Sequence, residues 1–488
     1  MLKAYVNGAS NAASVSFSAP ALQLSGTKLN NSDIHLYTRC DTLLLDARTT
    51  RQDDKARNMS LCLAASASHN SLNTSLRWAT DNRSDFRGVL NCNSIFSKSP
   101  DGERTAHISV EPSEMYIQDT LWHIRPSRIM IGQKDITVDN FLIEHDKQHI
   151  AIDGRLRQNA SDSLVLNLSD INVAYIMNLI NFHSVDFAGD ASGTAVVKKP
   201  FSKLQAEARL TVSNFLFEQG RMGTLSVSAG WDNQSGQINL EGQCLDPDVI
   251  PENGEEKDRT YPGTAATTPR KNWGVTDVKG YVSIKKNYID LDIKARNTRA
   301  EFLQTFCSSF LDSVSVHTTG DLRLWGDLSE ISLTGTAVAN GKVFVTPLGT
   351  AYTLRDDTVS LVHNDIRFAR CKVYDSNGNY GIVNGAIHHQ YLSRMTYDIN
   401  VQAEHLHCYE QPIGYGESFG GHVIGSGTCK ITGRPGEIVF DIEAYPEKGS
   451  EIVYNISSPE TLQNQEFITW RTTARETDIP QDLSLIHI

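Results

Sequence analysis

ASGTAVVKKPFSKLQAEARL (191–210), TTGDLRLWGDLSEISLTGTA (318–337) and GSGTCKITGRPGEIVFDIEA (425–444) are three copies of one sequence pattern. In each copy a glycine opens a short segment of alternating apolar and polar residues, a polar turn follows, and a second alternating segment returns. The three glycines are Gly193, Gly320 and Gly427. Each copy is typical of a β-hairpin, and a recurring hairpin indicates a stacked, repetitive architecture rather than a compact catalytic domain.

Most of the chain shows the same period of two residues. In YIDLDIK (288–294) every second residue is apolar, which predicts a strand with one dry face and one wet face. Short connections rich in Asn, Asp and Gly favour antiparallel pairing and argue against a parallel β-helix. The predicted hairpin turns are Asn340-Gly341, Asn377-Gly378 and residues 232–236. The sequence therefore predicts an all-β fold: a long, mostly antiparallel, curled sheet with a few short helices.

Two segments have apolar residues at helical rather than strand spacing. They are SDINVAYIMNLINF (169–182) and TRAEFLQTFCSSFL (298–311). Thr298 and Glu301 form a predicted capping box at the start of the second segment. Each segment comes shortly before one of the repeated hairpins. We interpret both as helices that plug or cap the open end of a section of the sheet, in preference to a binding role.

Composition excludes some classes of function. The chain has 45 Lys and Arg against 57 Asp and Glu, a formal net charge of −12, so a general nucleic-acid-binding surface is not expected. The eight cysteines lie far apart and form no Cys-x-x-Cys pair, which argues against zinc ribbons and redox motifs. We expect single thiols that pack as small apolar residues.

The N-terminal residues contain no apolar run of signal-peptide length, and no segment approaches the length of a membrane span. On its own this pattern would indicate a soluble cytoplasmic protein. The chain, however, begins within a strand-like pattern and stops at DLSLIHI, which completes no recognisable element. We therefore expect an internal piece of a longer protein.

Candidate sites for chemistry are few. His405 and His407 would point the same way on a regular strand and could share a metal ion, but two ligands do not define a zinc site. A solvated or hydrogen-bonded strand face is the preferred interpretation. Motifs for a nucleophile elbow, a phosphate loop or a zinc protease are missing. We expect no enzyme activity and no cofactor, although a pair of acids suited to glycoside hydrolysis would not be visible in the sequence.

If a strand and its turn take roughly 11–13 residues, the chain supplies on the order of 40 strands. So many strands must form several sandwiches or one continuous trough, and the lack of linkers favours the trough. A trough with an apolar concave face can hold acyl chains out of water at about 0.8 kcal/mol for each buried methylene. The alternation predicts that the water-facing residues include Asp290, Asp292, Arg323 and Asp441. The predicted lining residues are Ile289, Leu291, Ile293, Leu322, Leu324, Ile331, Leu333, Ile399, Val401, Ile438, Phe440 and Ile442.

Four further stretches resemble a known family. They are TLWHIRPSRIMIGQKDITVDNFLIEHDKQHIAIDGRL from Thr120, VTPLGTAYTLRDDTVSLVHNDIRF from Val345, YDSNGNYGIVNGAIHH from Tyr374 and YPEKGSEIVYNISSPETLQNQEFITW from Tyr445. With the glycine hairpins they resemble the TamB family of translocation and assembly module subunits, in the form found in Bacteroidetes-like bacteria, among the AsmA-like repeating β-groove proteins.

The resemblance divides the chain as follows. Residues 1–118 are a weakly matched section of groove, and residues 119–470 carry the TamB-like repeats. The polar, Pro-rich segment near 246–271 is an insertion in the sheet rather than a domain linker, and residues 471–488 are a truncated or non-native tail.

The resemblance implies a bridge across the periplasm of a Gram-negative bacterium. In the full-length family members an N-terminal helix anchors the protein in the inner membrane, and the C-terminal end meets an outer-membrane barrel of the Omp85 type. The implied role is transport of phospholipid between the membranes and assembly of outer-membrane proteins. We expect this chain to be a fragment of the shaft without the anchor or the complete C-terminal domain, so neither docking activity is assigned to it.

Two alternative functions stay open. Exposed strand edges along the trough could pair with a guest strand, which would make the protein a scaffold or chaperone for barrel assembly. An extracellular β-rich adhesin or polysaccharide-binding protein is the third possibility.

Overall fold

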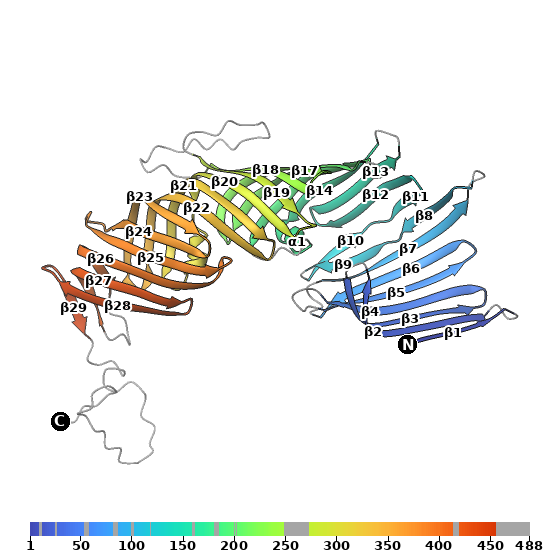
Figure 1. The fold of residues 1–488 in the computed structure, drawn as a ribbon, viewed down its shortest axis with the longest axis horizontal. Helices are drawn as coiled ribbons and strands as arrows, with labels where there is room; N and C mark the ends of the chain where they lie inside the picture. The colour runs from blue at the N-terminus through green and yellow to red at the C-terminus, as the bar shows by residue number, and fades with distance from the viewer. Residues whose placement is uncertain are drawn as a thin grey trace, which may run out of the picture.

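The computed structural model describes residues 1–8, 12–24, 27–52, 58–81, 86–98, 102–117, 119–158, 162–179, 185–199, 201, 203–247, 273–412 and 419–454. These residues form one sheet of 29 strands with two short α-helices (Figure 1). All strand pairs are antiparallel, so the predicted all-β, antiparallel fold is confirmed.

The first half of the sheet contains β1 to β14. Their bounds are β1 Leu2–Asn7, β2 Ala12–Leu24, β3 Thr27–Arg39, β4 Thr42–Gln52, β5 Asn58–Ser68, β6 Ser71–Thr80, β7 Phe86–Lys98, β8 Arg104–Val110, β9 Ser113–Ile117, β10 Thr120–Ile124, β11 Ser127–Ile131, β12 Asp135–His145, β13 Gln148–Arg157 and β14 Ser163–Asn172.

The second half contains the helices and β15 to β29. Their bounds are α1 Val173–Leu179, β15 Phe187–Lys198, β16 Gln205–Phe217, β17 Gly220–Asp232, β18 Gln237–Asp246, β19 Gly274–Ser283, β20 Tyr288–Arg299, α2 Leu303–Cys307, β21 Leu311–Asp327, β22 Glu330–Val345, a 3-10 turn Thr346–Leu348, β23 Thr350–Val362, β24 Asp365–Tyr374, β25 Tyr380–Gln390, β26 Ser393–Gln411, β27 Phe419–Arg434, β28 Glu437–Pro446 and β29 Glu451–Tyr454.

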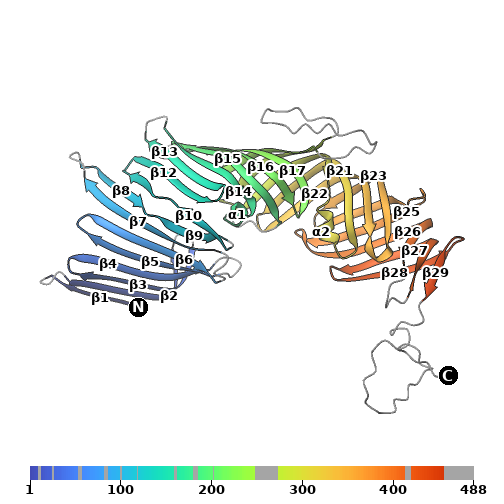
Figure 2. The ribbon, with the colours of Figure 1, turned by 180° about the vertical axis from the view of Figure 1, so that it is seen from behind.

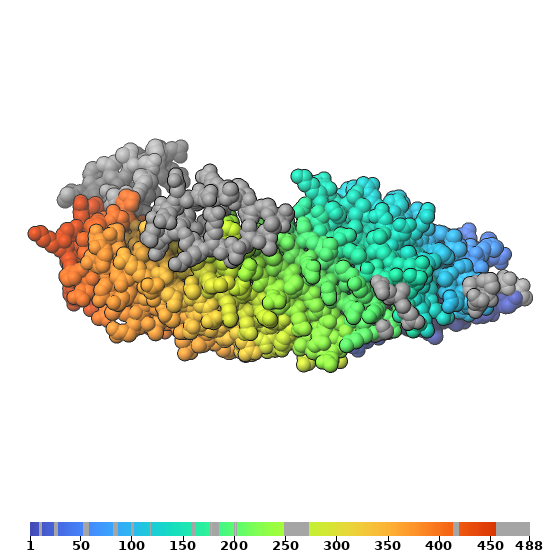
Figure 3. Space-filling model, turned by 90° about the horizontal axis from the view of Figure 1, so that it is seen from above, coloured from blue at the N-terminus to red at the C-terminus, as the bar shows by residue number. Residues whose placement is uncertain are grey.

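The sheet is a meander in which neighbours in sequence are neighbours in space. It coils into an elongated gutter with β1 at one end and β29 at the other, and it is much longer than it is wide when seen from above (Figures 1 and 3). Both helices lie inside the curl of the sheet (Figure 2). The fold is therefore a continuous trough over the described residues, rather than a set of separate sandwiches.

One hairpin of the meander is broken in both of its strands. β8 and β9 continue one another across Pro112, and β10 and β11 do so across Pro126. β8 pairs with β11, and β9 pairs with β10, so the two breaks lie opposite each other. Proline has no backbone N–H to donate, so each one interrupts the ladder. The sheet changes direction at this hairpin (Figure 1).

The glycines of the three repeated hairpins occupy equivalent positions. A Cβ atom at Gly193, Gly320 or Gly427 would lie 2.1 Å from a backbone carbonyl oxygen of the paired strand. No side chain fits at that distance, so each glycine permits a close approach of two backbones. All three predicted hairpins are present, as β15–β16, β21–β22 and β27–β28.

Two of the three predicted turns are present, and one is wrong. Residues 232–236 and Asn377-Gly378 connect β17 to β18 and β24 to β25. Asn340-Gly341 lies inside β22, where the pairing with β23 shifts register and Gly341 has a φ of +136°. The Asn340 side chain bonds both the backbone N–H and the carboxylate of Asp356 across this bulge. The dipeptide supplies a bulge, which uses the same conformational freedom as a turn.

Both predicted helices are shorter than expected. Residues 169–172 belong to β14, and Thr298 and Leu311 belong to β20 and β21, so both helices begin later than predicted and α2 also ends earlier. Residues 180–182 lie outside the described residues. The predicted capping box is wrong, because α2 starts after Phe302 without a side-chain cap. The Thr298 hydroxyl instead lies 2.7 Å from the Thr276 hydroxyl, and Glu301 bonds Arg299. Sheet pairing has overridden local helical spacing at the start of the first segment and at both ends of the second.

The expected strand number was too high, because the strands are longer than a typical strand of five to six residues. β26 alone has 19 residues, and β21 has 17. The insertion predicted near 246–271 falls between β18 and β19, whose ends pair at Asp246 and Gly274, and residues 248–272 lie outside the described residues.

Candidate functional site

The candidate site is the apolar concave face of the sheet. In its first part, apolar residues of consecutive strands lie opposite one another in the pairing, and all of them are half-buried. They are Phe17, Ile34, Ala47, Leu63, Leu76 and Leu90. Along the described chain, Val110 is the first apolar residue that is buried. The trough is therefore open over β2 to β7.

A second, covered part of the trough lies around α2. The segment 300–310, here called the plug, crosses the concave face. The Thr305 hydroxyl donates to the carbonyl of Glu218 in the turn between β16 and β17, at 2.6 Å. On the other side, the Tyr397 hydroxyl of β26 donates to the carbonyl of Phe306, at 2.8 Å. The plug is thus tied to strands on both sides of the trough.

A cavity of about 310 Å³ lies between the plug and the sheet. The plug contributes Phe302, Phe306 and Phe310 to its wall, and Phe310 packs edge-on against Tyr397 at 5.1 Å. The other lining side chains are aliphatic, aromatic or thiol groups, apart from two threonines and the Tyr352 hydroxyl, which is bonded to a backbone carbonyl. Such a wall offers apolar contact and almost no polar group to a ligand.

The structure places the predicted lining residues on this face. Leu322, Leu333, Ile399, Val401 and Ile442 line the cavity, and Ile442 lies at an exposed position, with 51% of its surface accessible. Ile289, Leu291, Leu324 and Ile331 form a neighbouring apolar cluster. Ile438 and Phe440 pack against the cluster that contains Tyr397 and the plug, and Ile293 lies opposite Leu322 in the pairing of β20 with β21.

The opposite face of the same strands is polar. Asp292, Arg323 and Asp441 are exposed there, and Arg323 forms two hydrogen bonds of 2.8 Å with the carboxylate of Asp290. The bonds from Arg323 lower the pKa of the Asp290 carboxyl below its usual value. The alternation therefore separates a dry face from a wet face, as it does in any half-buried sheet.

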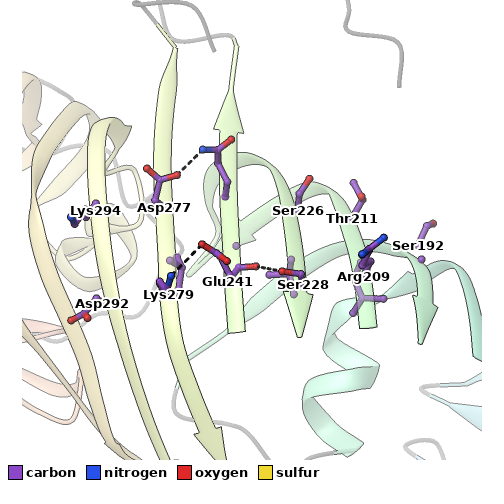
Figure 4. A pocket seen from close by; sticks show the side chains of 16 residues that line it. Ser192, Arg209, Thr211, Ser226, Ser228, Glu241, Asp277, Lys279, Asp292 and Lys294 are labelled. Atoms are coloured by element: carbon purple, nitrogen blue, oxygen red, sulfur yellow. Dashed lines mark hydrogen bonds and ion pairs between the residues drawn. The ribbon is translucent and has the colours of Figure 1, made fainter. Parts of the chain in front are cut away.

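The wet face is hollowed over β15 to β20, with a volume of about 770 Å³ (Figure 4). Its walls carry three basic and three acidic side chains, and some of these polar groups bond one another. Lys279 lies 3.6 Å from Glu241, and Gln243 donates to Asp277 at 2.6 Å. Because these groups satisfy one another, the hollow shows no concentration of a single charge that would select a charged ligand.

The structure does not bring His405 and His407, the candidate metal ligands in the sequence, together. The register of β26 against β27 shifts between Ala403 and Leu406, and His405 has a φ of +54°. His405 contacts Glu447 and is largely exposed, whereas His407 lies against Glu410 and His422. The position of His422 beside His407 could not be predicted from sequence spacing, because His422 lies on the next strand, β27.

The thiols of the covered part are inert. Burial raises the pKa of Cys307 to about 12 and that of Cys429 to about 11. All eight cysteines are unpaired, and Cys244, Cys307 and Cys371 are buried. These three pack as small apolar residues, whereas Cys40 is exposed.

No known protein family, curated protein or solved structure matches the chain. Among the described residues, neither α-helix is long and apolar enough to cross a membrane. The architecture and the concave apolar face are therefore the observations on which a function rests.

Proposed function

We propose that this protein shields lipid acyl chains in its apolar trough, as a section of a bridge that carries phospholipid between two membranes. The single observation that carries the proposal is the continuity of the apolar face from the open section at β2 to β7 to the cavity beneath the plug. In the strand pairing, only apolar residues and glycines lie opposite one another from Ile124 to Leu322, which lines the cavity. Each methylene that enters the trough contributes about 0.8 kcal/mol, so a chain of ordinary length offsets the cost of leaving a bilayer without any catalytic group.

The half-exposed state of the face supports this function. A face that served only as a core would be covered by a second layer, because burying its apolar side chains stabilises the fold. Leu63, Leu76 and Leu90 instead remain partly accessible with no second layer over them in the described structure. Together with the sequence resemblance to the TamB family, this favours a periplasmic location and an Omp85-type barrel as partner of the full-length protein.

Photo-crosslinking tests the proposal at neighbouring residues that face opposite ways. A photoreactive phenylalanine analogue replaces Leu76 or Arg77 in β6, and Leu322 or Arg323 in β21. After irradiation of cells with labelled phospholipid, we expect lipid adducts at positions 76 and 322 and little at 77 and 323. Native mass spectrometry of the purified chain provides the second readout, as co-purified phospholipid. Equal labelling of both faces, or a chain free of lipid, would contradict the proposal.

The edge of β28 favours a second candidate function, a scaffold for guest strands. Val439 and Tyr445 are 57% and 72% exposed, and no described strand pairs with the outer edge of β28. Such an edge can accept an added strand. Binding of peptides from outer-membrane barrel strands to a chain that takes up no lipid would support this candidate over the first.

A further inference from the structure

The end of β26 brings two imidazoles and a carboxylate together. A ligand atom from each of His407, Glu410 and His422 lies within 4.8 Å of the other two. Nε2 of His407 is 3.0 Å from Oε2 of Glu410, and Nδ1 of His422 contacts the same oxygen. The centres of the two imidazole rings are 4.4 Å apart. The three groups thus converge on one point.

A β-bulge produces this convergence. On a regular strand, His407 and Glu410 are three residues apart and would face opposite sides of the sheet. The pairing with β27 shifts between His407 and Tyr409, so one extra residue is inserted at Cys408. Glu410 then lies directly opposite His422 and on the same side as His407. Bulges are enriched beside functional sites, where they redirect a side chain in this way.

Side chains from other strands hold the backbone of His407 in place. Its N–H donates to the buried carboxylate of Asp375, at 3.0 Å, and its carbonyl accepts from the Tyr352 hydroxyl, at 3.0 Å. Asp375 is itself fixed by the backbone N–H groups of Asn377 and Asn379, each at 2.9 Å. A ligand set supported by such contacts needs little reorganisation on binding.

We propose that His407, Glu410 and His422 bind a zinc ion. Two imidazole nitrogens and a carboxylate oxygen are a common ligand set for Zn²⁺, with a fourth position left for water. In a tetrahedral site with bonds of about 2.0–2.1 Å, ligand atoms are roughly 3.3 Å apart. The three ligand atoms lie within 4.8 Å of one another, so each spacing needs to change by about 1.5 Å at most.

Accessibility and charge fit an ion that enters from solvent. The His407 side chain is 16% exposed, while the side chains of His422 and Glu410 are 38% and 51% exposed. The site is therefore walled on one side and open on the other. The Glu410 carboxylate supplies a negative charge beside the two imidazoles, which suits a divalent cation. This inference is independent of lipid binding, because it rests on the three ligands alone.

His405 provides a matched control on the same strand. Its Nδ1 contacts a carboxylate oxygen of Glu447, and Ser426 donates to the other oxygen of that carboxylate. This pair has one imidazole and one carboxylate without a third ligand, so it is not expected to hold zinc tightly. The His405→Ala variant also lacks one exposed imidazole. Any loss of zinc binding in this variant therefore measures unspecific binding to surface histidines.

Isothermal titration of the purified full chain with Zn²⁺, after treatment with a chelator, tests the site. We expect one equivalent to bind, with an affinity lowered more than about 100-fold in His422→Ala and in Glu410→Gln, and unchanged in His405→Ala. The melting temperature should rise with Zn²⁺ in the parent chain and in His405→Ala only. Co²⁺ in place of Zn²⁺ should give visible absorption bands that the His422→Ala variant lacks.

The proposal is overturned if the parent chain does not bind zinc, if His422→Ala binds it unchanged, or if His405→Ala loses binding equally. Glu410→Gln preserves the shape of the side chain, so a folding defect of His422→Ala does not decide the test. If a folded Glu410→Gln variant binds zinc as the parent does, the carboxylate is no ligand and the proposed site is wrong.

Discussion

Leu333→Glu is the substitution that tests the trough most directly. Leu333 lies in β22 opposite Leu324, lines the cavity and packs against the buried Ile331. Loss of a half-buried leucine costs about 1 kcal/mol. A carboxylate without a partner in an apolar wall adds roughly 1–3 kcal/mol. A domain with a stability of about 5–15 kcal/mol tolerates this sum, so the variant should fold.

Lipid binding should be weakened strongly although the variant still folds. In the lipid-free variant, water can reach the new carboxylate from the open side of the trough, but an acyl chain in the cavity removes that water. A penalty of about 2–4 kcal/mol corresponds to an affinity lowered roughly 30-fold to several hundred-fold. The assay measures co-purified phospholipid per chain by native mass spectrometry, together with the melting temperature as a check on folding.

The control must lie on the wet face and leave its neighbours intact. The sequence alone predicts that Arg323→Glu has little effect, but Arg323 is paired with Asp290, so a glutamate there would place two carboxylates together. Arg323→Gln removes the charge without adding a repulsion and is the better control. Equal lipid content in the folded Leu333→Glu variant and the parent chain, or equal loss in both variants, would refute a lipid path past Leu333.

Three further predictions concern shape, backbone and pH. Small-angle scattering should give a radius of gyration above about 30 Å, where a compact globule would give about 23 Å and contradict the trough. Gly320→Val should cost more than about 3 kcal/mol in thermal unfolding, because its Cβ would lie 2.1 Å from the Thr336 carbonyl, whereas Gly230→Val, which meets no atom within 4 Å, should not. Glu447 raises the pKa of His405, so this contact stabilises the fold at low pH, and that stabilisation is lost as the pH rises through the raised pKa. In Glu447→Gln, the pKa of His405 measured by NMR titration should return toward about 6.5.

The sheet could be predicted from the sequence, because its evidence is local and repeated. Alternation in Ile289, Leu291 and Ile293 assigns a face to each residue, and the same face follows in every strand that pairs with it. The repeated glycines marked hairpins correctly, since a close backbone approach tolerates no side chain. The helices were overextended for the opposite reason. The helical spacing in residues 298–311 is also a local pattern, but both ends of this segment pair as strands, in β20 and β21.

The histidine cluster could not be predicted, because it depends on β-bulges in β26 that no sequence pattern indicates. Val401 and Leu406 both line the cavity although they are five positions apart. An odd difference in position would put them on opposite faces of a regular strand. The shift near His405 restores the apolar face to the trough, and the next shift at Cys408 turns Glu410 toward His407. One shift therefore keeps the trough apolar, and the next one along the strand assembles the polar cluster on the outside. A single-residue change of register at this point would alter both faces at once.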